Sequence, residues 1–289
     1  MGCPCEVKLE GASAAVLDAA AADARREVER LDAKYSHYRD DSLVAQLAAC
    51  ADAGSTLQVD DETANLLDFS ASLHAQSDGR FDITAGALTK LWDLHGTRVP
   101  STEEIQAARA RCGWDKVRWQ RPALGFAARG MRLDLGGVVK EYAADRAAQV
   151  CRDAGVQHGI VDLGGDLAVV GTHADGSPWL AGIKAPRDPT HALARIQLHA
   201  GGLATSGDYE RALIVDGKRY SHIVDARNGM PMESFASVSV LAASCLVAGA
   251  ASTLAMLFGV QAGYAWLEQL GLPFLCVDAD GSVRGTLKS

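Results

Sequence analysis

One histidine stands in a segment whose residue types suit acid–base chemistry. Residues 221–229 read S-H-I-V-D-A-R-N-G, and the imidazole of His222 can take or give a proton near neutral pH. In an extended segment Asp225 lies on the opposite face from His222, so we expect no direct bond between them unless the chain bends. Asn228 and Gly229 are a strong turn signal. Taken alone, the segment favours a structural histidine over a catalytic one.

Two glycine-containing turns have the composition of anion-binding loops. In the first, residues 134–137 read D-L-G-G and precede a predicted helix, where backbone N–H groups and the helix N-terminus favour a phosphate. Lys140 adds a positive charge three residues later. The second, T-S-G-D-Y at 205–209, places two hydroxyls and a carboxylate beside a glycine. Each also fits an ordinary turn, and neither is a dinucleotide-binding G-x-G-x-x-G or a P-loop.

Composition narrows the class of protein. The chain has 289 residues, of which 48% are hydrophobic and 22% charged, values typical of a globular enzyme with a sizeable core. Its formal net charge of -8 argues against non-specific binding to nucleic acid or anionic membranes. An anionic ligand must therefore be held by local donors.

The sequence shows neither a membrane-spanning segment nor a signal peptide. The longest apolar stretch, 242–260, is rich in Ala, Gly and Ser, so we expect a buried core helix and no membrane span. No signal peptide is visible, because Glu6 and Lys8 interrupt the segment that would have to be apolar. Seven scattered cysteines favour reduced thiols. We expect a cytoplasmic protein, or a periplasmic one if a leader has been trimmed.

The elements alternate without a regular βαβ rhythm, which favours an α+β fold. Helices are predicted at 13–31, 42–51, 60–77, 102–111, 140–154, from about 246, and at 262–270. Strands are predicted at 5–9, 132–135, 160–163, 203–206, 212–215, 238–241 and 274–277. No linker is long enough to separate domains.

Taken in order, the motifs resemble those of the ApbE flavin transferases. The resemblance begins at Met1 and Gly2 and passes through Tyr38, Ser42 and S-D-G-R-F-D-I-T at 77–84. It continues with L-D-L-G-G-V-V-K at 133–140, V-D-L-G-G-D at 161–166, A-T-S-G-D-Y at 204–209, Y-S-H-I-V-D at 220–225 and the small-residue helix ending at Gly259. It implies a single ApbE-like domain over 1–289, with mixed or antiparallel sheets and flanking helices.

The resemblance also implies an activity. A member of this family binds FAD and, with Mg²⁺, transfers FMN to a Thr or Ser hydroxyl of an acceptor flavoprotein, releasing AMP. His222 occupies the position of the family's catalytic histidine. The implied flavin and adenine contacts are Met1, Tyr38, Thr84, Ala85, Gly86, Asp134, Lys140 and Ile223. The implied magnesium ligands are a backbone carbonyl near Gly137, Thr253, and an aspartate one helical turn before Thr253.

Three positions depart from the family pattern. Gly249 stands where the metal aspartate is expected, Cys3 replaces a threonine, and Ala48 replaces an asparagine near the flavin. Glycine offers Mg²⁺ no side-chain oxygen, so we expect weaker metal binding unless Asp166 or Asp208 substitutes. If the missing ligand limits activity, Gly249→Asp should raise magnesium affinity and turnover together, whereas no change would mean that the metal is held otherwise or is not used. Two alternatives stay open: an FAD-binding protein with little catalysis, and an FAD pyrophosphatase that yields FMN and AMP.

Overall fold

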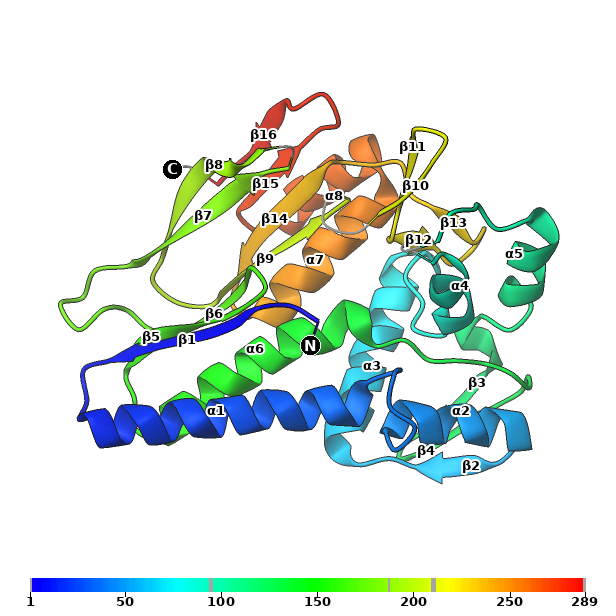
Figure 1. The fold of residues 1–289 in the computed structure, drawn as a ribbon, viewed down its shortest axis with the longest axis horizontal. Helices are drawn as coiled ribbons and strands as arrows, with labels where there is room; N and C mark the ends of the chain where they lie inside the picture. Colours follow the sequence, from blue (N-terminus) through cyan, green and yellow to red (C-terminus); the bar gives the residue numbers. More distant parts are fainter. Residues whose placement is uncertain (1, 94–95, 187, 209–211, 288–289) are drawn as a thin grey trace.

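A seven-stranded antiparallel sheet forms the centre of the molecule (Figure 1). The structure is a computed structural model that describes residues 2–93, 96–186, 188–208 and 212–287, without the side chains of 188–191. The strand order is β1 (Cys5–Glu10), β5 (His158–Leu163), β6 (Asp166–Gly171), β9 (Gly202–Gly207), β14 (Ser237–Ala242), β15 (Phe274–Val277) and β16 (Val283–Gly285). Antiparallel pairing beside flanking helices confirms the predicted α+β class.

Four helices cover one face of this sheet: α1 (Ala14–Tyr35), α6 (Gly136–Asp153), α7 (Cys245–Phe258) and α8 (Val260–Leu270). Figure 1 shows α1, α6 and α7 lying side by side. Fully buried alanines such as Ala144 and Ala248 let the backbones of α6 and α7 approach closely. The small-residue segment is thus the buried core helix that its composition predicts. No helix within the described ranges is long and apolar enough to cross a bilayer.

The opposite face of the sheet is covered by a hairpin of β7 (Trp179–Ala185) and β8 (Asp188–Leu198). Side chains alternate between the two faces, as a pleated strand requires. Val161 and Leu163 pack toward the helices, whereas Ile160 packs toward Ile183 and Ile196 of the hairpin. Both faces of the sheet are therefore buried.

Shorter elements gather at one end of the sheet (Figure 1). The helices α2 (Leu43–Ala53) and α3 (Asp61–Gln76) accompany a three-stranded sheet of β2 (Thr56–Gln58), β4 (Ala123–Phe126) and β3 (Val117–Gln120), with a 3₁₀ turn at Trp114–Lys116. Beside them lie α4 (Gly86–Leu91), α5 (Thr102–Arg109) and two hairpins, β10 (Ala212–Val215) with β11 (Lys218–Ser221) and β12 (Val224–Asp225) with β13 (Met230–Pro231). Leu88, Trp92, Ile105 and Leu213 form a small separate core there.

Local signals located most helix starts correctly, with one error in the glycine-rich region. The side chain of Ser42 accepts the Ala45 N–H at 3.0 Å, so it is the N-cap of α2 as predicted. The strand predicted at 132–135 is wrong, because only Arg132 forms an isolated bridge, with Ala85. The helix after it begins at Gly136, earlier than the expected Lys140. The two glycines therefore lie inside the first turn of α6.

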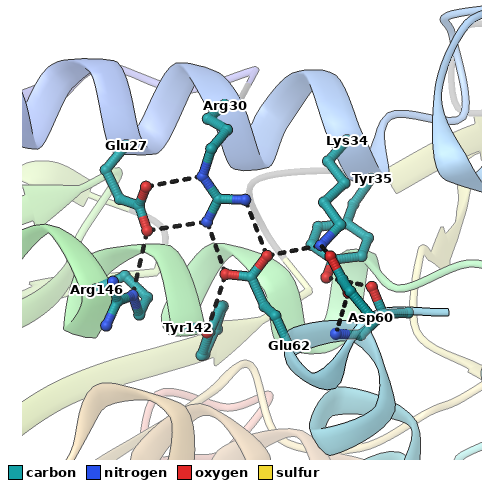
Figure 2. A network of polar contacts seen from close by, with 9 residues as sticks. Glu27, Arg30, Lys34, Tyr35, Asp60, Glu62, Tyr142 and Arg146 are labelled. Atoms are coloured by element: carbon teal, nitrogen blue, oxygen red, sulfur yellow. Dashed lines mark hydrogen bonds and ion pairs between the residues drawn. The ribbon is translucent and has the colours of Figure 1, made fainter. Parts of the chain in front are cut away.

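A network of charged side chains ties α6 to α1 and α3 (Figure 2). The guanidinium of Arg30 contacts Glu27 at 2.8 Å and Glu62 at 2.7 Å. Lys34 contacts Glu62 at 2.7 Å, and the hydroxyl of Tyr142 on α6 donates to the same carboxylate at 3.2 Å. Burial acts to raise the pKa of Glu62, but Arg30 and Lys34 outweigh it and lower that pKa to about 2.

This network predicts a pH-dependent contribution to stability. The pKa of Glu62 falls from 4.5 to about 2 on folding, so its contribution is complete above pH 4.5 and is lost toward pH 2. We expect Glu62→Gln to lower the free energy of unfolding by about 1 kcal/mol at pH 7 and by much less near pH 3, as measured by urea unfolding. Glu29→Gln, which removes only an exposed pair with Arg25, is the control. An equal cost of Glu62→Gln at both pH values would contradict this assignment.

Candidate functional site

The N-terminus of α6 presents exposed backbone next to an anchored aspartate. Gly136 and Gly137 are both exposed in the first turn, and the N-cap residue Leu135 supplies no side-chain bond. Asp134 accepts the Gly136 N–H at 2.9 Å and the Thr89 hydroxyl at 2.8 Å. An eighteen-residue helix carries positive potential at this end, so the turn is suited to an anion.

Lys140 is joined to a buried carboxylate on the sheet. Its Nζ lies 2.7 Å from Asp166, whose side chain is 3% exposed. The other oxygen of Asp166 accepts the Thr205 N–H at 3.2 Å, just where β6 and β9 stop pairing after two residue pairs. Burial acts to lower the pKa of Lys140, but the nearby charges of Asp166 and Glu141 outweigh it and raise that pKa. Lys140 is therefore held as a cation beside the helix terminus.

Glu141, one residue further along α6, is a buried carboxyl that none of the sequence motifs singles out. It is 7% exposed, and its Oε2 has no hydrogen-bond partner in the described part of the chain. Burial, and then the charge of Asp166, raise its pKa well above the usual range. A Cβ atom added at Gly249 of α7 would lie 2.5 Å from Glu141 Cγ and 3.0 Å from Oε1. The Glu141 side chain thus occupies the space that a side chain at position 249 would need.

Three hydroxyls lie together between β9 and α7. The Oγ of Ser206 is 2.8 Å from Ser252 Oγ and 3.0 Å from Thr253 Oγ1. Ser252 in turn donates to the Gly249 carbonyl at 3.0 Å. Thr253, predicted as a magnesium ligand, is four residues from Gly249 and so shares its helix face. The hydroxyls therefore lie near the face of α7 against which Glu141 packs.

His222 lies half-buried in the bend between β11 and β12. Two bonds fix the residues that follow it: Arg80 accepts the Ala226 N–H at 3.1 Å, and the Trp92 indole donates to the Gly229 carbonyl at 2.8 Å. As expected from the strand geometry, Asp225 turns elsewhere and pairs with Arg227 at 2.9 Å. The histidine segment is thus anchored to residues 80–92.

Residues 83–86 lie against the segment that leads into α6. Ile83 accepts the Asp134 N–H at 2.7 Å, and Arg132 accepts the Gly86 N–H at 3.2 Å. A Cβ at Gly86 would lie 2.8 Å from the Arg132 carbonyl oxygen, so this contact requires glycine. Thr84 and Ala85 are buried, and the Thr84 hydroxyl accepts the Gly113 N–H at 2.7 Å.

The other three expected contacts to flavin and adenine are Ile223, Tyr38 and Met1. Ile223 is buried and its carbonyl accepts the Met232 N–H at 2.8 Å. Tyr38 is 86% exposed in the loop between α1 and α2. Met1 lies outside the described residues. Backbone hydrogen bonds therefore connect the motifs at 77–86, 132–140 and 220–229. A second set of side-chain contacts connects Lys140 and Asp166 to the segment 205–206 and to Thr253.

Most donor atoms near Lys140 are oxygens, although the Cys3 thiol also lies close enough to interact with its charge. Among the residues that the structure describes, no group of three or more His, Cys, Asp or Glu side chains is arranged to hold a metal. Two carboxylates, Asp166 and Glu141, lie there with the hydroxyls of Ser206 and Thr253. Carboxylate and hydroxyl oxygens are the hard donors that suit Mg²⁺.

One feature of the sequence does mark Glu141. It interrupts the otherwise apolar helical stripe of Val138, Ala144 and Ala148.

Comparison with known proteins shows the family of the chain. The ApbE family matches residues 1–276. The chain belongs to the ApbE family. It is 30% identical to the FAD:protein FMN transferase of Escherichia coli K12 over 279 residues, covering 90% of this chain and 79% of that protein. The flavin transferase ApbE structure from Vibrio cholerae superposes with a TM-score of 0.87 at 27% identity, covering 100% and 94% of the two chains. The apo Pseudomonas stutzeri flavinyl transferase ApbE gives 0.85 at 33%, covering 98% and 90%.

The buried ion pair predicts a large cost for removing its cation. Lys140→Met leaves Asp166 buried and uncompensated beside Glu141, so we expect the free energy of unfolding to fall by about 3 kcal/mol in urea titrations at pH 7. Adding Asp166→Asn should recover part of this loss. Lys8→Met, which removes an exposed pair with Glu6, is the control. Equal costs for the two lysine variants would show that the pair is not structurally important.

Proposed function

We propose that this chain is an FAD:protein FMN transferase. It cleaves the pyrophosphate of FAD, attaches FMN through a phosphoester to a Thr or Ser hydroxyl of an acceptor flavoprotein, and releases AMP. The observation that carries the proposal is the anion-binding start of α6 with Lys140 beside it, in a chain that matches the family over residues 1–276. We also propose that residues 1–289 act as one domain.

The proposed binding residues have two roles: some hold the pyrophosphate, and others contact the flavin and the adenine. The exposed Gly136–Gly137 turn and Lys140 are suited to hold the pyrophosphate, because N–H groups, helix dipole and ammonium all favour negative charge. Asp134, Thr84, Ala85, Gly86, Ile223, Tyr38 and Met1 are the proposed contacts to flavin and adenine. The close approach of 83–86 to 132–134 supports grouping four of these on one surface.

His222 is the proposed general base. It accepts the proton of the acceptor hydroxyl as that oxygen bonds to the phosphorus nearest the flavin. The bond from this phosphorus to the bridging oxygen breaks, and AMP leaves with that oxygen. The half-buried position of His222 supports this role, and the Arg80 and Trp92 bonds hold the turn that follows its segment.

The oxygen-rich donor set fits the magnesium that the family implies. Thr253 and a backbone carbonyl near Gly137 are the proposed ligands, with Asp166 and the unpartnered oxygen of Glu141 nearby. When bound, Mg²⁺ neutralises charge that develops on the phosphates. All seven cysteines are free, which supports a cytoplasmic location with reduced thiols.

Replacing His222 tests the proposed base. We expect His222→Ala to lower the rate of FMN transfer about 10² to 10⁴-fold while the affinity for FAD changes by less than about threefold. Transfer is followed by covalent flavin fluorescence on an acceptor flavoprotein in denaturing gels, and FAD binding by fluorescence quenching. His199→Asn, a change at an exposed histidine, is the control. Unchanged transfer by His222→Ala would refute the assignment.

The same assay separates the two alternatives. Sustained AMP release with free FMN and no labelled acceptor would identify a pyrophosphatase. FAD binding without AMP release would identify a binding protein.

A further inference from the structure

Where α6 packs against α7, the Glu141 side chain fills the space beside Gly249. Gly249 is buried, and a Cβ there would overlap Glu141 at 2.5 Å from Cγ and 2.9 Å from Cδ. Cγ is in the middle of the Glu141 side chain and Cδ is its carboxyl carbon, so relieving the overlap requires the whole buried side chain to change its rotamer. In its present conformation Glu141 leaves room only for glycine at position 249.

Burying this carboxyl is costly by itself. Glu141 is 7% exposed, its Oε2 has no hydrogen-bond partner among the described residues, and the negative Asp166 acts on it. A buried polar oxygen without a partner destabilises a fold unless a ligand completes its contacts. A cation bound at this oxygen would complete its contacts.

The neighbouring atoms favour a divalent cation. Position 249 is one helical turn before Thr253, whose hydroxyl joins Ser206 at 3.0 Å. Asp166 adds a second carboxylate, which already shares its charge with Lys140 at 2.7 Å. Lys140 leaves the Glu141 oxygen unpartnered, so the site can accept further positive charge. Mg²⁺ commonly binds through one or two carboxylates, completing its shell with other oxygens.

We propose that Glu141 on α6 supplies the metal-binding carboxylate that is missing at position 249 of α7. The carboxylate reaches the same space from the facing helix, and Gly249 is the vacancy that admits it. This inference rests on the proposed function, which calls for Mg²⁺ beside the pyrophosphate. It also predicts that Gly249→Asp alone does not improve metal binding, because the new side chain would overlap Glu141.

A set of four variants tests this with Mn²⁺ alone as the probe, using EPR to measure the free ion and thermal unfolding to monitor the fold. We expect Glu141→Gln to weaken Mn²⁺ binding about 10-fold or more and to leave the melting temperature without metal unchanged or higher. Gly249→Asp should lower the melting temperature by about 5 °C without tightening Mn²⁺ binding. Glu141→Ala with Gly249→Asp should restore both properties toward wild type, a non-additive result.

Asp145→Asn is the matched control, because Asp145 is a carboxylate on the same helix that accepts the Cys245 and Leu246 N–H groups of α7. It should leave the Mn²⁺ affinity unchanged. The proposal is overturned if Glu141→Gln binds Mn²⁺ as wild type does, or if Gly249→Asp alone binds it more tightly with no loss of stability.

Measuring FMN transfer by the wild-type protein in parallel separates the two proposals. Glu141-dependent Mn²⁺ binding without FMN transfer would refute the function and support the metal ligand. FMN transfer with Mn²⁺ binding that is independent of Glu141 would refute only the ligand.

Discussion

The ion pair between Lys140 and Asp166 is the interaction on which the arrangement of the site depends. Asp166 lies at the first residue of β6, where that strand and β9 diverge, and its second oxygen replaces a ladder bond by accepting the Thr205 N–H. One carboxylate thus joins α6, β6 and β9. Because it is buried, it needs the ammonium of Lys140, and the ammonium in turn fixes the first turns of α6 against the sheet.

On its other side α6 is held by the surface network around Glu62 (Figure 2). Tyr142 reaches that network two residues after Lys140, so two residues of one helix turn are bound on opposite sides of α6. The exposed glycines before this turn therefore sit on a helix start that cannot rotate freely. A rigid helix terminus lowers the reorganisation needed when an anion binds.

Local chemistry predicted more of the fold than long-range packing did. The cap Ser42, the buried small-residue helix α7 and the strand β5 follow from patterns within a few residues. The β7–β8 hairpin was not anticipated, because Leu180 is apolar yet 67% exposed and obscures the alternation. Lys140 followed from the glycine turn that precedes it and from the family pattern, and Thr253 from the family pattern alone, whereas Glu141 followed from neither. Its depth depends on how α6 is rotated against α7, which a single sequence does not specify.

The packing at Gly249 also links the sizes of two residues that are far apart in the sequence. A side chain at position 249 of α7 and the Glu141 side chain of α6 compete for one volume, so a chain carrying both would be overfilled. The size of the residue at one position therefore limits the size of the residue at the other. In relatives of this chain, a side chain at the position of Gly249 should accompany a residue smaller than glutamate at the position of Glu141, so the two alignment columns should vary together.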